Sequence, residues 1–244
     1  MLTFLELLLR FFFLRIRKRK LELRDRAVWM HQSCVLVLRR IGVAITREGP
    51  APEYGLIVSN HLSYLDILLH AAIGPRIFVS KDDVRSWPVF GLLASLGGTI
   101  FIKRGKRSSA TEAAIAMEFS LRSGIPIAFF PEGTSTDGRT LLPFHTFLFE
   151  PAVEAEIPVS AAALSYESPG AEERDLCYYG DVHFAPHLWE MLGRKNVMGR
   201  IRFDGKPRTY SHRKQAANDC WERVARLRLR TQLSEHPDAA LQGH

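Results

Sequence analysis

The first 40 residues place apolar and basic positions in the pattern of amphipathic helices. From Leu2 to Ile16, 11 of 15 positions are apolar, and the interruptions include Glu6, Arg10 and Arg15. Such a helix would be ~23 Å long, shorter than the roughly 30 Å hydrocarbon core of a bilayer. A basic cluster, residues 17–20, follows the apolar stretch, whereas a secretory signal peptide has its basic region first. The pattern therefore predicts an interfacial helix.

A second amphipathic helix is expected from Arg24 to Arg40, where Gly42 would stop it. Lipid contact is the favoured interpretation of this helix pair, because soluble proteins rarely expose a run such as Phe11-Phe12-Phe13. The alternative is that both helices only cover the core and leave their arginines in water.

Beyond Pro52, short apolar runs alternate with helical stretches, which predicts a mostly parallel sheet flanked by helices. Strands are expected at Gly55–Ser59, Ile77–Ser80, Gly98–Ile102, Ile125–Phe130, Ile157–Leu164 and Gly199–Phe203. Helices are expected at Tyr64–Ala72, Pro88–Leu96, Ser109–Ser123 and Tyr210–Leu233. Ser109 and Glu112 would cap the third of these helices, and Gly124 would follow its end. The expected α/β protein has an N-terminal membrane-docking helix pair (1–47), an α/β domain (48–235) and a frayed tail (236–244).

Composition and charge narrow the class of protein. With 46% hydrophobic and 24% charged residues, the 244-residue chain is neither disordered nor collagen-like. Three widely spaced cysteines argue for a reducing compartment and against a zinc cage. The net charge of +7 comes from the N-terminal segment, because residues 1–47 hold 11 Lys or Arg and 3 Asp or Glu. These cations alternate with Leu and Phe, which favours an anionic membrane surface over nucleic acid.

Polar residues follow three of the predicted strands, at the edge where ligands of parallel sheets bind. The first loop runs from Asn60 to Asp66 and contains His61. The second holds four cations within residues 103–107, and the third is a Gly-rich acidic turn over residues 131–138. Together they predict a site for an anionic substrate with a histidine as the candidate base.

The spacing of His61 and Asp66 allows two interpretations. On one helix their side chains would point roughly 140° apart. If Ser63 caps a helix that begins there, however, His61 lies in the preceding loop and can fold back towards Asp66. Asp66 would then hold one ring nitrogen and leave the other basic, with the attacking hydroxyl supplied by the substrate. Alternatively, Asp66 completes a capping box and His61 is an ordinary loop residue.

The cations and the acidic turn also have two interpretations each. Lys103 and Arg104 follow a strand and precede a helix, so they suit a phosphate, and Arg104 fits one bidentately. Otherwise they belong to a solvated loop. Glu132 follows a fully apolar strand and is either a turn carboxylate or a buried or substrate-facing residue.

Four motifs in order resemble those of the lysophospholipid/glycerolipid acyltransferase family. Residues 60–66 (NHLSYLD) are similar to its NHx4D motif, residues 98–104 (GTIFIKR) to GxxFIxR, and residues 130–134 to FPEGT. The short fourth motif matches Ile157-Pro158-Val159. The resemblance covers about residues 55–160, and the N-terminal helix pair is similar to the membrane-docking pair of bacterial members.

This resemblance implies transfer of a fatty acyl group from acyl-CoA or acyl carrier protein to a lysolipid hydroxyl. His61 would be the general base and Asp66 its orienting partner. A backbone N–H near Gly97-Gly98 would stabilise the oxyanion, and no metal or tightly bound cofactor is required. The implied substrate-binding residues are Asn60, Lys103, Arg104, Glu132, Gly133 and Thr134.

The first acceptor implied is 1-acyl-glycerol-3-phosphate, at the cytoplasmic face of the inner or plasma membrane, with peripheral or monotopic attachment. Ser135 stands where many lysophosphatidate-specific members have arginine. This difference keeps another lysolipid, such as a lyso-ornithine lipid, as an alternative acceptor. An alternative from another class is a non-catalytic lipid-binding protein.

Overall fold

Seven strands form one sheet within the part of the chain that the computed structural model describes, residues 2–18, 20–103 and 107–235. Residues 107–110 and 231–235 are described by their backbone only. The strand order is β1-β7-β6-β2-β5-β3-β4, and every neighbouring pair is parallel except β6 and β7. The strands are β1 (Val43–Glu48), β2 (Leu56–Ser59), β3 (Ile77–Lys81), β4 (Ile100–Ile102), β5 (Ile127–Phe129), β6 (Val159–Glu167) and β7 (Val197–Phe203). The predicted α/β class with a mostly parallel sheet is confirmed.

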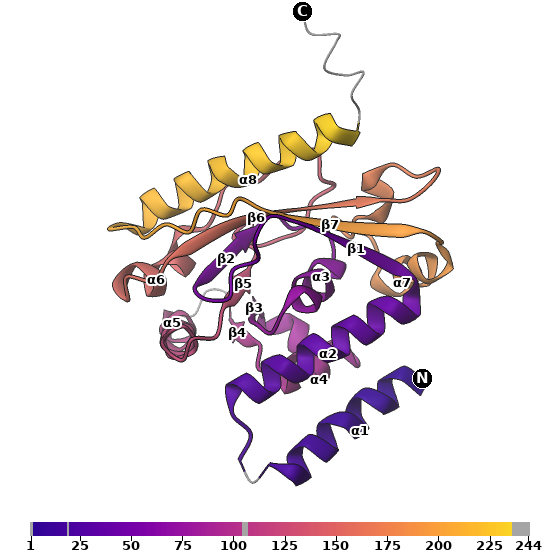
Figure 1. The fold of residues 1–244 in the computed structure, drawn as a ribbon, viewed down its shortest axis with the longest axis horizontal. Coiled ribbons are helices and arrows are strands. Elements are labelled where there is room, and N and C mark those ends of the chain that lie inside the picture. Colours follow the sequence, from indigo (N-terminus) through magenta and orange to yellow (C-terminus); the bar gives the residue numbers. More distant parts are fainter. Residues whose placement is uncertain (1, 19, 104–106, 236–244) are drawn as a thin grey trace, which may run out of the picture.

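Helices cover both faces of this sheet (Figure 1). They are α1 (Leu2–Arg17), α2 (Leu23–Ile41), α3 (Leu65–Ile73), α4 (Phe90–Leu96), α5 (Arg107–Arg122), α6 (Glu150–Glu154), α7 (Phe184–Gly193) and α8 (Arg213–Glu235). Short 3-10 helices occupy Asp82–Ser86, Thr146–Phe149 and Glu173–Leu176. Figure 1 shows α8 across one face of the sheet, with α3, α2 and α1 successively farther from the other face.

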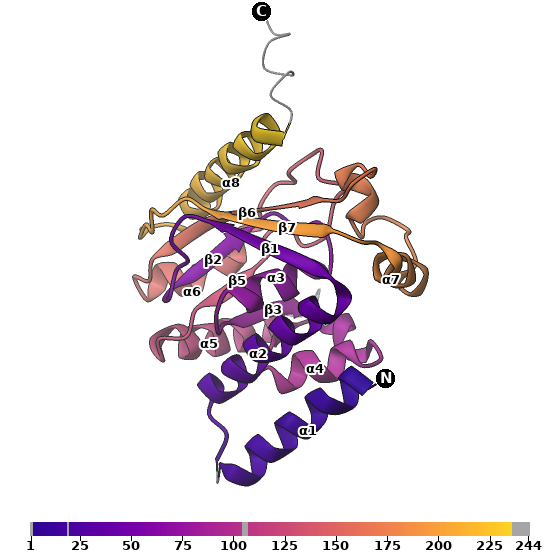
Figure 2. The ribbon, with the colours of Figure 1, turned by 45° about the vertical axis from the view of Figure 1, so that its right-hand side comes forward.

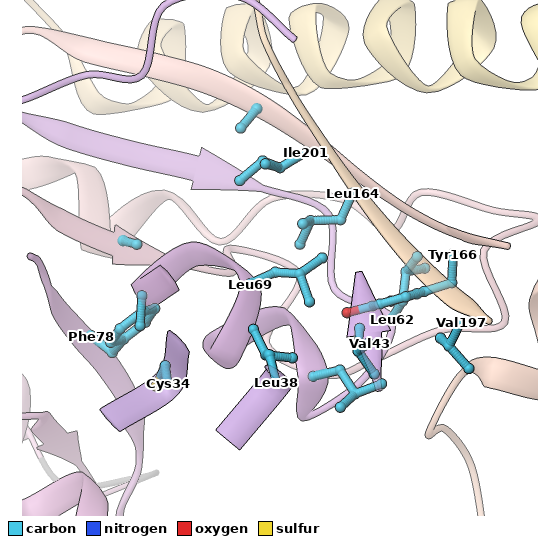
Figure 3. Packing of buried hydrophobic residues seen from close by; sticks show 14 of the residues in the cluster. Cys34, Leu38, Val43, Leu62, Leu69, Phe78, Leu164, Tyr166, Val197 and Ile201 are labelled. Atoms are coloured by element: carbon cyan, nitrogen blue, oxygen red, sulfur yellow. The ribbon is translucent and has the colours of Figure 1, made fainter. Parts of the chain in front are cut away.

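Alternate residues of the strands enter two separate hydrophobic clusters, because successive side chains of a strand point to opposite faces. Ile57 of β2 belongs to the cluster that also holds residues of α1, α2, α3 and α7, whereas its neighbours Leu56 and Val58 belong to the cluster that holds residues of α5, α6 and α8. All four residues of β2 are buried, as expected for a central strand covered on both faces. Figure 3 shows part of the first cluster, where Leu69 of α3 lies beneath Leu164 and Ile201.

Helix α1 packs against α2 along one side and exposes apolar residues on the other. Leu7 is buried, its carbonyl accepts a hydrogen bond from Trp29 Nε1 at 3.3 Å, and the Phe11 ring centroid lies 5.1 Å from that of Trp29. The outer side exposes Leu2, Leu5, Leu9, Phe12, Phe13 and Ile16. No helix in the described part of the chain has the length and apolar character that crossing a membrane requires.

The structure corrects two details of the predicted elements. Residues 43–48 form β1 directly after Gly42 and pair in parallel with β7, so the sheet begins inside the segment assigned to the helix pair. Gly42 itself ends α2 in the left-handed conformation, as predicted. Helix α5 is already helical at Arg107, so Ser109 lies within the helix and is not its N-cap.

Gly55, just before β2, lies very close to the backbone of Pro158, just before β6. Its φ is +91°, and a Cβ there would lie 2.3 Å from the carbonyl oxygen of Pro158. Gly124 has a φ of +74° with nothing near its Cβ position, so Gly124→Ala should cost only about 1 kcal/mol of backbone strain. We expect Gly55→Ala to lower the free energy of unfolding clearly more, as measured by urea denaturation. Equal losses in the two variants would contradict the tight fit.

Candidate active site

His61 lies in the loop between β2 and α3 and folds back onto Asp66, in the first turn of α3. Its Nδ1 is 2.7 Å from Asp66 Oδ2, which confirms the predicted contact. The predicted cap is wrong, because α3 begins at Leu65 and the buried Ser63 hydroxyl has no hydrogen-bond partner in the described residues. The loop is held instead by Asp66, whose Oδ2 accepts the backbone N–H groups of Leu62 at 2.6 Å and Ser63 at 3.0 Å.

The second oxygen of Asp66 accepts a hydrogen bond from Tyr166, at the far end of β6. The Tyr166 hydroxyl donates to Asp66 Oδ1 at 2.5 Å, and both side chains are buried. Figure 3 shows Tyr166 packed close to Leu62 within the core. Burial and the Asp66 carboxylate raise the pKa of Tyr166 well above its usual value, so the hydroxyl remains a donor. Tyr166 belongs to no motif, so the sequence held no signal for this contact.

The imidazole of His61 is fixed in orientation and open on one edge. Because Asp66 accepts from Nδ1, the proton lies there and Nε2 is the basic nitrogen. The ring stacks on Phe130, with centroids 4.2 Å apart and planes inclined by 12°. Its side chain is 21% exposed, and Nε2 has no hydrogen-bond partner among the described residues. The ring lines a cavity of about 1010 Å³.

Glu132 holds the backbone of His61. Its Oε1 accepts the N–H of His61 at 2.7 Å and its Oε2 accepts the N–H of Leu142 at 2.9 Å. The carbonyl of His61 accepts the N–H of Thr136 at 2.9 Å, so both backbone groups of the histidine are bonded. Glu132 is 3% exposed and does not line the cavity. In this structure Glu132 is thus buried and holds the His61 loop, which is one of the two roles that the sequence left open.

Asn60 is also turned into the protein and does not line the cavity. Its side chain is buried, its Nδ2 donates to the carbonyl of Leu164 at 3.1 Å, and its Oδ1 accepts the N–H of Leu164 at 2.8 Å. These two bonds join the end of β2 to β6. They fix the place in the sheet from which the His61 loop departs.

The cavity combines a large apolar part with a smaller polar part. The apolar walls come from α1, α2, α3 and α4, including Leu7, Trp29, Met30, Val37, Leu68 and Leu93. Its polar lining includes His61, Lys103, Gly133, Thr134 and Ser135, so three of the predicted substrate-binding residues border it. Lys103 Nζ also lies 3.6 Å from Asp82 Oδ2. Arg104 lies outside the described residues.

The expected oxyanion donors are not available. The N–H of Gly97 donates to the carbonyl of Leu93 at 2.9 Å, and that of Gly98 donates to Ser95 at 3.2 Å. A Cβ on Gly98 would lie 3.0 Å from Leu23 and 3.1 Å from Ile77, so this glycine permits close packing. Within the described ranges, no group of three or more His, Cys, Asp or Glu side chains is placed to hold a metal ion.

The fold and this site together define an α/β enzyme with a His–Asp pair beside a largely apolar cavity. Residues 40–165 match the model of the family described as Acyltransferase, and the chain belongs to this family. The resemblance drawn from the four motifs is thereby confirmed.

Similar proteins include two kinds of bacterial acyltransferase. One from Neisseria meningitidis, named 1-acyl-sn-glycerol-3-phosphate acyltransferase, is 35% identical over 75% of this chain and 72% of its own length. One from Rhodobacter capsulatus, named lyso-ornithine lipid O-acyltransferase, is 38% identical over 64% of this chain and 60% of its own. The crystal structure of the acyltransferase PlsC from Thermotoga maritima covers 93% of this chain and 87% of its own, with a TM-score of 0.66. At 18% identity, that likeness shows the fold.

Glu132 should make stability depend on pH. Burial raises the pKa of its carboxyl from the ordinary 4.5 to about 7, although two backbone N–H groups oppose the shift. Between these values the unfolded chain releases a proton that the folded chain keeps, so stability falls as pH rises through this window. We therefore compare the free energy of unfolding of the wild type with that of Glu132→Gln. The wild-type value minus the variant value should fall by up to about 3 kcal/mol as the pH rises from about 4.5 to about 7. Urea denaturation at several pH values measures this difference. A pH-independent difference would contradict the raised pKa.

Proposed function

We propose that this enzyme transfers a fatty acyl group from acyl-CoA or acyl carrier protein to the free hydroxyl of a lysolipid, with His61 as general base. The observation that carries the proposal is the His61–Asp66 contact of 2.7 Å, which leaves Nε2 as the basic nitrogen on the cavity. No nucleophilic side chain is needed, since the acceptor supplies the attacking oxygen.

The reaction follows from this geometry. His61 Nε2 takes the proton of the lysolipid hydroxyl as its oxygen attacks the thioester carbonyl. Asp66 stabilises the imidazolium that forms, and its bonds to Leu62, Ser63 and Tyr166 keep it in place. Collapse of the tetrahedral intermediate breaks the carbon–sulfur bond and completes the new ester. The proton on His61 then passes to the departing thiolate.

The acceptor that we propose is 1-acyl-glycerol-3-phosphate, which gives phosphatidic acid. A phosphate suits the polar part of the cavity, where Lys103 supplies a cation and the turn at Gly133 and Thr134 supplies backbone and hydroxyl groups. Arg104 follows Lys103 in sequence and is proposed as a further phosphate ligand. The apolar walls contributed by α1 to α4 would take fatty acyl chains.

A lyso-ornithine lipid is the second candidate acceptor. Ser135 lines the cavity where an arginine would add a cation, and its hydroxyl donates to the carbonyl of Tyr178 at 2.5 Å. A less cationic pocket is better suited to a headgroup that carries its own amine. The similarity to proteins named lyso-ornithine lipid O-acyltransferase supports the same candidate.

The enzyme is further proposed to work at the cytoplasmic face of the inner or plasma membrane, attached peripherally through the N-terminal helices. The exposed side of α1 carries large apolar residues, Phe12 and Phe13 among them, together with arginines, and the basic cluster follows directly. Such a helix can lie in the interface with its cations at the phosphates of anionic lipids. No metal or tightly bound cofactor takes part in the proposed reaction.

Replacing His61 tests the role of the base. His61→Ala should lower the rate of acyl transfer by at least about 10²–10⁴-fold, because the general base is lost. The measurement is transfer of labelled acyl groups from acyl-CoA and, separately, from acyl carrier protein. His212→Ala is the control, since His212 is exposed and does not line the cavity. Its rate should stay close to that of the wild type.

Undiminished transfer by folded His61→Ala protein would exclude the proposed base. If the wild type binds lysolipid but transfers no acyl group from either donor, the non-catalytic lipid-binding alternative is correct.

An acceptor panel tests the headgroup. The purified enzyme is offered 1-acyl-glycerol-3-phosphate, a lyso-ornithine lipid and lysophosphatidylethanolamine with one labelled donor, and the products are identified by mass spectrometry. We expect phosphatidic acid as the main product. The second candidate is established instead if the wild type prefers the lyso-ornithine lipid. In that case Ser135→Arg should shift the preference of the enzyme towards 1-acyl-glycerol-3-phosphate.

A further inference from the structure

Helix α7 exposes an apolar face that no described residue covers. Its exposed residues are Ala185, Pro186, Trp189, Glu190, Leu192 and Gly193. Trp189 is 80% exposed, and Leu192 is 47% exposed. The single charge on this face is that of Glu190, which is paired with Arg194 at 2.6 Å. Water is therefore a poor environment for this face of α7.

The inner face of α7 connects it to the cavity. Phe184, at its first turn, has its ring centroid 5.1 Å from that of Tyr64 and 5.1 Å from that of Trp87. Tyr64 and Trp87 both line the cavity beside His61. An object that binds the outer face of α7 would thus be separated from the cavity by α7 itself, whose Phe184 packs on the cavity-lining residues Tyr64 and Trp87.

Helix α7 also lies on the same side of the sheet as the N-terminal helices. Its buried Met191 belongs to the hydrophobic cluster that contains Leu7 of α1 and Trp29 of α2. Figure 1 and Figure 2 both place α7 and the N-terminal end of α1 towards the same end of the molecule. The exposed apolar residues of α1 and those of α7 therefore lie on the same side of the sheet.

We propose that α7 is a second lipid-contacting element, which places Trp189 and Leu192 in the interfacial layer of the membrane. This inference rests on the proposed function only in that the substrates are lipids. Indole rings favour the interface between headgroups and acyl chains, where their apolar body and N–H group are both accommodated. Lys195 follows the helix and is exposed, so it supplies a cation for anionic headgroups. Contact at α7 and α1 together would fix how the cavity faces the bilayer.

Fluorescence quenching by lipid tests the position of Trp189. The full-length protein is mixed with phosphatidylglycerol-containing vesicles whose acyl chains carry bromine, and tryptophan emission is recorded. We expect quenching in the wild type and a clear reduction of it in Trp189→Phe, with the remainder from Trp29 and Trp87, which line the cavity. The control is Trp221→Phe, because Trp221 is 37% exposed on α8, which covers the opposite face of the sheet. Its quenching should match the wild type.

Two double variants test whether the contact contributes to binding. Trp189→Ser with Leu192→Ser should weaken partition into the same vesicles by about tenfold or more, since two apolar side chains no longer enter the interface. Ile115→Ser with Phe119→Ser is the matched control, because these α5 side chains are 62% and 64% exposed and α5 packs into the other hydrophobic cluster. Partition of this control should be unchanged.

The proposal is overturned if Trp189→Phe is quenched like the wild type, or if the α7 double variant partitions like the α5 control. Turnover of short-chain, dissolved lysolipid and donor separates this inference from the proposed function. The α7 double variant should keep wild-type kcat in that assay. If the wild type itself shows no turnover there, the proposed function fails, and the quenching result still decides the role of α7.

Discussion

The Asp66 carboxylate is the group on which the geometry around His61 depends, since it accepts four hydrogen bonds at the start of α3. Two come from the loop backbone, one from Tyr166 and one from the imidazole. Holding the loop and orienting the histidine are therefore the work of one side chain. Without these four donors, burial of the Asp66 side chain would be costly, and His61 would lose the contact that orients its ring.

A second layer of contacts holds the loop from outside. Glu132 binds the backbone N–H of His61, Phe130 supports its ring, and Asn60 ties the end of β2 to β6. Two of these residues come from the chain that leaves β5, the strand next to β2. Parallel neighbours bring their carboxyl ends to one edge, so residues about 70 positions apart meet there. The sheet topology thus holds His61 in a fixed position through contacts that no single segment of the chain could provide.

Most of the sheet could be predicted because its central strands are short apolar runs between turn residues. β1 could not, since only Val43 of this segment is buried and the segment adjoins a helix. In the site, the spacing of His61 and Asp66 was sufficient to find their contact. The sequence could not predict that Glu132 binds backbone N–H groups, because a polar residue after a strand can face either the backbone or the cavity. Tyr166 depends on where β6 ends, which residue patterns do not report.

The join between α2 and β1 has a consequence for how the N-terminal helices can be regarded. Helix α2 forms part of the cavity wall, and one residue, Gly42, separates it from a strand that closes the edge of the sheet. The N-terminal helices are therefore part of the α/β domain and not an independent module that could be removed or exchanged. Removing residues 1–48 would remove one wall of the cavity. It would also leave the backbone of β7 as an unpaired sheet edge, open to pairing with other chains.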